Sequence, residues 1–60
     1  MNKHIAFVVD AFPTHVDVTW SLSNGELVTL TFAKLTRSLR RAIADENIAA
    51  IMSIWDEELH

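Results

Sequence analysis

The sequence predicts an α+β fold in which a three-stranded antiparallel meander precedes two C-terminal helices. Two segments alternate strictly between apolar and polar residues, and no glycine or proline occurs after residue 32. Such alternation is typical of antiparallel strands that bury one face, and a stretch without helix-breaking residues favours helix. With 60 residues and no linker or internal repeat, the chain is predicted to form one small domain, residues 1–60.

The first strand is predicted over about residues 4–9. Residues 5–9 are β-branched, aromatic or alanine, so this strand is apolar on both of its faces. A strand of this kind at the edge of a sheet associates with other chains unless something covers it. We therefore expect the first strand to take part in contacts outside its own sheet.

The second and third strands are predicted over about residues 15–22 and 26–32. In both, every second residue is apolar, and the residues on the opposite side include Asp17, Thr19 and Ser21 in the second strand and Thr29 and Thr31 in the third. The pattern assigns one buried and one solvent-facing side to the sheet. The apolar side consists of Val16, Val18, Trp20, Leu22, Val28, Leu30 and Phe32.

The loop between these strands is predicted to contain three residues, Ser23-Asn24-Gly25. A two-residue Asn-Gly loop would pair Trp20 with Thr29 and mix the two faces, whereas a three-residue loop pairs Trp20 with Val28. The longer loop also puts the glycine where a type I turn followed by a bulge needs a left-handed residue.

The helices are predicted over about residues 33–44 and 47–59. Their two apolar stripes are rotated by more than a right angle from each other, which favours a break at Asp45-Glu46-Asn47, with Asp45 or Asn47 as N-cap. One long kinked helix is the alternative. One or both helices are expected to cover the apolar face of the sheet; the first can cover it alone, which would leave the second stripe in excess. The stripes are Leu35, Leu39, Ala42 and Ile43, then Ile48, Ile51, Trp55 and Leu59.

Composition and charge exclude several classes of protein. Half of the residues are apolar and the net charge is only −3, which argues against intrinsic disorder. The chain has no cysteine, so disulfide scaffolds and thiolate zinc sites are excluded. No uncharged stretch approaches the roughly 20 residues of a membrane span. The N-terminal apolar run ends at Asp10 and is too short for a secretory signal, so we expect a cytoplasmic protein.

No residue pattern indicates an enzyme. The three histidines, His4, His15 and His60, lie in no metal-binding or catalytic motif, and no serine lies in a nucleophile-elbow context. We therefore expect no catalytic residue, no metal and no other cofactor.

The surplus of apolar residues predicts a non-enzymatic protein-interaction module. We expect a small accessory, regulatory or inhibitor protein of the phage or plasmid type, which docks on a partner protein and forms a homodimer. Tryptophan is enriched at the centres of interfaces, which points to the stripe of the second helix. The predicted interface residues are Phe7, Ile48, Ile51, Trp55 and Leu59.

The alternative is a nucleic-acid-binding regulator. Four of the five basic residues fall in one short segment, and on a helix most of them would share one side and could bind phosphate. The net negative charge and the acidic-to-neutral polar side of the sheet argue against this alternative. The four residues are Lys34, Arg37, Arg40 and Arg41.

Overall fold

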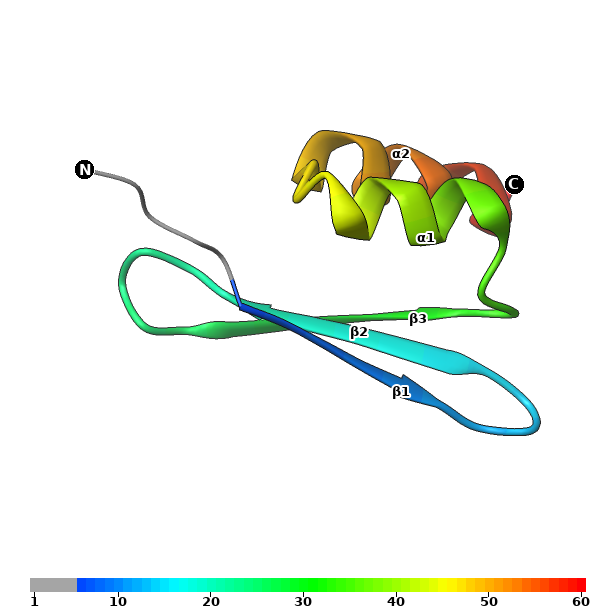
Figure 1. Cartoon of the computed structure of the whole chain (residues 1–60), viewed down its shortest axis with the longest axis horizontal. Coiled ribbons are helices and arrows are strands. Elements are labelled where there is room, and N and C mark those ends of the chain that lie inside the picture. The colour runs from blue at the N-terminus through cyan, green and yellow to red at the C-terminus, as the bar shows by residue number, and fades with distance from the viewer. Residues whose placement is uncertain (1–5) are drawn as a thin grey trace.

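The computed structural model, which describes residues 6–60, confirms the predicted α+β fold. One antiparallel sheet with the order β1-β2-β3 is formed by β1 (Phe7–Ala11), β2 (Val16–Ser21) and β3 (Leu27–Phe32). Two helices follow, α1 (Arg37–Ala44) and α2 (Ile48–Leu59), and both lie on the same side of the sheet (Figure 1). The described residues therefore form two layers, and none of them places a helix on the opposite face of the sheet.

The β2–β3 hairpin has the predicted three-residue loop. Trp20 pairs with Val28 and Val18 with Leu30, so the apolar residues of both strands share the helix side. Gly25 has a φ of 90°, and its N–H donates to the Leu22 carbonyl at 2.9 Å. On the open side of the sheet, the hydroxyls of Thr19 and Thr29 lie 2.9 Å apart, as expected from the same register.

Strand β1 ends two residues later than predicted. Asp10 and Ala11 pair with Asp17 and Val16, so the charged residue continues the ladder instead of ending it. The side chain of Asp10 lies on the open face, where solvent accommodates its charge. The hairpin closes at Phe12, whose N–H donates to the His15 carbonyl at 2.8 Å. Residues 4 and 5 of the predicted strand lie outside the described residues.

Helix α1 begins at Arg37, so the predicted start at residue 33 is wrong. The Thr36 backbone is extended, and its hydroxyl accepts a hydrogen bond from the Leu39 N–H at 3.2 Å. This is the geometry of an N-cap, which defines the first turn of a helix and leaves the preceding residues outside it. Lys34 consequently lies in the loop between β3 and α1 and not on the helix.

The predicted break between two helices is confirmed, and its geometry is specific. Asn47 caps α2, because its Oδ1 accepts from the Ala50 N–H at 3.1 Å. Glu46 has a φ of 54°, and the N–H groups of Glu46 and Asn47 donate to the carbonyls of Ile43 and Ala42. This pair of bonds is the Schellman arrangement that ends a helix at a left-handed residue. Neither helix is long and apolar enough to span a membrane.

Both helices contribute to the core, so the apolar face of the sheet is covered by two helices and not by the first alone. Helix α2 lies against α1 and against β3. Its Ile51 is fully buried beside Leu39 of α1. The sheet needs both helices because α1 has only eight residues. The buried core consists of Val16, Val18, Trp20, Phe32, Leu39, Ala42 and Ile51.

Replacement of Gly25 tests the loop that fixes this register. Gly25→Ala is expected to lower the free energy of unfolding by about 1 kcal/mol, because a side chain disfavours the positive φ. No atom lies within 4 Å of an added Cβ, so the cost is conformational and not a clash. Gly25→Asn should cost less, since asparagine tolerates left-handed backbone. Urea denaturation measures both. Equal stability of wild type and Gly25→Ala would contradict the loop geometry.

Candidate interaction surfaces

Helix α2 carries a line of apolar side chains on the flank of its buried face. Ile48, Met52, Trp55 and Leu59 follow one another at intervals of four, three and four residues, which places them along one side of a helix. Ile48 and Trp55 are half-buried, whereas Met52 is 50% and Leu59 63% exposed. We call these four residues the α2 stripe.

The α2 stripe differs by one residue from the helical part of the predicted interface, since Met52 takes the place of Ile51. Ile51 belonged to the prediction, but its side chain is buried in the core and is not accessible to a partner. Met52 lies on the exposed flank instead. The sequence pattern alone is compatible with either Ile51 or Met52 on the exposed side of α2. The packing of α2 against β3 and α1 determines that Met52 faces outward.

Strand β1 exposes apolar side chains on both faces of the sheet. Val8 lies on the open face and is 53% exposed, and Val9 lies on the helix face and is 37% exposed. Phe12, just beyond the strand, is 48% exposed and stacks on the His15 ring with centroids 4.7 Å apart. Among residues 6–60 no strand pairs with the outer side of β1. We call Val8, Val9 and Phe12 the β1 edge patch.

Phe7, another predicted interface residue, turns toward the core. Its ring lies at a tilt against the buried Trp20 ring, with centroids 5.7 Å apart, and it packs on the edge of the core cluster. Its side chain is half-buried. The contact of Phe7 with Trp20 thus holds the start of β1 against β2. The exposed large apolar side chains of this region belong to residues later in the chain.

The open face of the sheet is polar and partly acidic. Asp10 and Asp17 lie directly opposite each other on β1 and β2, which disfavours the pair electrostatically. Asp17 accepts a hydrogen bond from the Thr31 hydroxyl at 2.9 Å, and its carboxylate lies 3.8 Å from Nε2 of His15. No group of three or more metal-ligating side chains within residues 6–60 could hold an ion.

The four basic residues of the described part of the chain are exposed, and none of them contacts a carboxylate there. Arg37, Arg40 and Arg41 lie on α1, and Lys34 lies in the loop before it. The charge contacts in the described part of the chain join His15 with Asp17 and His60 with Asp56, and none involves an arginine or lysine. These cations therefore face solvent.

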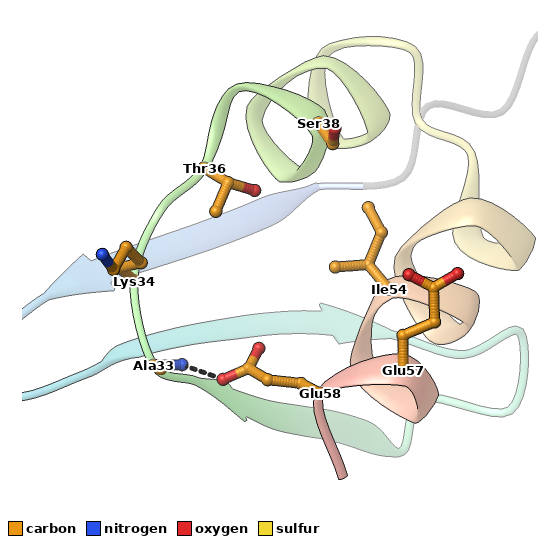
Figure 2. Close-up of a pocket in the computed structure, with 7 residues that line it drawn as sticks. All are labelled: Ala33, Lys34, Thr36, Ser38, Ile54, Glu57 and Glu58. Atoms are coloured by element: carbon orange, nitrogen blue, oxygen red, sulfur yellow. Dashed lines mark hydrogen bonds between the residues drawn. The ribbon is translucent and has the colours of Figure 1, made fainter. Parts of the chain in front are cut away.

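A groove of about 760 Å³ lies between the β3–α1 loop and the end of α2 (Figure 2). Glu58 reaches across it, and its carboxylate accepts a hydrogen bond from the backbone N–H of Ala33. Figure 2 shows the Lys34 side chain pointing away from this contact. The acidic end of α2 thus has a structural role that its charge pattern does not reveal. The lining residues are Ala33, Lys34, Thr36, Ser38, Ile54, Glu57 and Glu58.

Comparison with protein-family models, with curated proteins and with solved structures found no match to this chain.

Two substitutions on adjacent residues test which side of α2 faces the core. Ile51→Ala is expected to lower the free energy of unfolding by about 3 kcal/mol, because it leaves a cavity between the helices and the sheet. Met52→Ala should change it by about 0.5 kcal/mol, because half of the side chain is already in water. Ile51→Val, with a loss of about 1 kcal/mol, keeps the comparison measurable if Ile51→Ala unfolds. Chemical denaturation measures all three. A greater loss for Met52→Ala would contradict the packing.

Replacement of Glu58 tests its contact with Ala33. Glu58→Gln is expected to lower the free energy of unfolding by about 1 kcal/mol, because an amide oxygen is a weaker acceptor than a carboxylate. Glu57→Gln removes the same charge from the neighbouring residue and serves as the matched control. Thermal and urea unfolding measure the difference between the two variants, and identical stabilities would show that the contact does not hold α2 to the loop.

Proposed function

We propose that this protein is a non-enzymatic interaction module that docks on a partner protein through the free edge of β1. The observation that carries the proposal is the β1 edge patch, which exposes Val8 and Val9 on opposite faces of an edge strand. An extended segment of a partner can add to such an edge through main-chain hydrogen bonds, while alternate side chains provide contacts on each face.

The sequence of β1 supports this proposal because it lacks the usual protection of an edge. Natural edge strands carry lysine, proline or a bulge that discourages pairing with another chain. Within Phe7–Ala11 there is no lysine and no proline, and the pairing with β2 runs without a bulge. The single charge, Asp10, points to the open face and leaves the backbone of the edge accessible.

The opposite edge of the sheet is a poorer docking site. On the helix side, Val28 and Leu30 of β3 are half-buried against the core, and Phe32 is fully buried. On the open side, the hydroxyls of Thr29 and Thr31 are hydrogen-bonded to residues of β2. The exposed large apolar side chain of β3 is Leu27 at its first position, whereas β1 and the residue that follows it expose Val8, Val9 and Phe12.

The biological role that fits such a surface is that of a small accessory, regulatory or inhibitor protein of the phage or plasmid type, acting in the cytoplasm. Exposed apolar side chains on β1 and just beyond it support binding to another macromolecule.

A nucleic-acid-binding regulator is the second candidate, because the arginines of α1 are exposed and unpaired within the described residues. Phosphate contacts by Lys34, Arg37, Arg40 and Arg41 would give salt-dependent binding to a duplex. Two features disfavour it: the net charge is −3, and the open face of the sheet places two aspartates side by side. Both features would repel a polyanion.

Substitution of Val8 tests docking through β1. We expect C-terminally tagged protein to retain one stoichiometric partner from a nuclease-treated native lysate. Affinity for that partner, once purified, should fall at least about tenfold in Val8→Lys, because a lysine on the strand disfavours pairing of the edge. Calorimetry measures the affinity, and hydrogen exchange should show new protection of residues 7–11 in the complex.

Leu27→Lys is the matched control, because Leu27 is 72% exposed on the same open face of the opposite edge strand. It should bind as wild type does. Equal losses in both variants would contradict docking through β1. Binding to duplex DNA that weakens with salt and is abolished by Arg37→Ala with Arg41→Ala would instead support the second candidate.

A further inference from the structure

We infer that the segment which docks on β1 is basic: an extended strand that places a lysine or arginine beside Asp10 and apolar side chains beside Val8 and Val9. This inference rests on the proposed function, because it names the chemistry of the segment that adds to the free edge of β1. It goes beyond that function by assigning the edge a preference for positive charge.

The main-chain groups that β1 offers to another strand belong to alternate residues. The Phe12 N–H donates to the His15 carbonyl at 2.8 Å, and this pair continues the register of β1 with β2. Hydrogen-bonded and non-hydrogen-bonded pairs alternate along an antiparallel ladder, so Asp10 directs its main-chain groups toward β2. The N–H and C=O groups of Val9, and those of the residues two positions before and after it, therefore point toward the free edge. A further strand can add at these donors and acceptors.

Asp10 is the charged residue of this edge, and it has no cation partner within residues 6–60. Its cross-strand neighbour is Asp17, so two carboxylates lie opposite each other on the open face. Asp17 has polar neighbours of its own, because it accepts from the Thr31 hydroxyl at 2.9 Å and lies 3.8 Å from Nε2 of His15. The ion pairs in the described residues are this one and one near the end of α2, so the exposed Asp10 carboxylate belongs to neither.

A basic side chain on an added strand would compensate this charge. Side chains that face each other across antiparallel strands have Cβ atoms about 4.5–5.5 Å apart, which is within reach of a lysine or arginine. The added strand lies on the side of Asp10 away from Asp17, so its cation would meet the carboxylate that lacks one. An acidic residue at the same position would bring a third carboxylate into the row. The net charge of −3 also favours the approach of a basic segment.

The same charge argues against a second copy of this chain at the edge. Strand β1, with the sequence Phe-Val-Val-Asp-Ala, contains no basic residue, so two paired copies would leave both Asp10 carboxylates without a cation. The neighbouring positions select apolar residues, because Val8 is 53% exposed on the open face and Val9 is 37% exposed on the helix face. The expected segment therefore has one basic residue next to two apolar residues.

Selection from a phage-displayed library of random peptides of about twelve residues, long enough to span β1, tests the charge of the occupant. Against immobilised wild-type protein, we expect enrichment of peptides in which a lysine or arginine lies next to two apolar residues. An enriched peptide, made synthetically, is then measured by calorimetry. Asp10→Asn should weaken its binding about two- to fivefold, as for an exposed ion pair, and the difference should shrink at about 0.5 M salt.

Asp56→Asn is the matched control, because it removes the same charge from an exposed residue of α2 and should bind as wild type does. Asp10→Asn should not lower the free energy of unfolding, since it removes the repulsion with Asp17. Replacement of the basic residue of the peptide by glutamine should cost the wild-type protein the same factor as Asp10→Asn. It should cost the Asp10→Asn protein nothing further, because the two charges act as a pair.

Val8→Lys separates this inference from the proposed function. Peptides that lose binding to Val8→Lys but carry no excess of basic residues would overturn the preference for positive charge and leave docking through β1 in place. So would peptides that bind Asp10→Asn as tightly as wild type. A library that yields no peptide weakened by Val8→Lys would contradict docking through β1 itself, and with it both proposals.

Discussion

The pairing of β2 with β3 is the contact on which the rest of the molecule depends. It places Val16 and Trp20 on one face with Phe32 and leaves the polar residues on the other, so the sheet offers one continuous apolar surface. A shift of one residue would turn every one of these side chains to the wrong face. The left-handed Gly25 holds the loop at the length that this register requires.

The turn between the helices determines which helical side chains pack on the apolar face of the sheet. The left-handed Glu46 and the Asn47 cap reverse the chain within a few residues, so α2 returns against β3 and places Ile51 in the core. Glu58 then joins the end of α2 to Ala33, where the chain leaves the sheet. The exposed apolar regions of this arrangement include the β1 edge patch and the α2 stripe.

These two surfaces differ in the association that they favour. The β1 edge patch combines unpaired backbone with side chains on two faces, a pattern that suits an extended segment of another protein. The α2 stripe instead presents apolar side chains along one side of a helix, a pattern that suits packing against another helix.

The sequence by itself determined the strands of the hairpin, their register, the break at residues 45–47 and the absence of cysteine chemistry. All of these follow from local patterns, because alternation and capping act between residues close in the chain. Tertiary structure decided that Ile51 is buried and Met52 exposed, that Lys34 lies off the helix, and that Glu58 binds Ala33. Periodicity defines the apolar side of a helix, but the side that is covered depends on where the neighbouring elements pack, and those contacts join residues far apart in the chain.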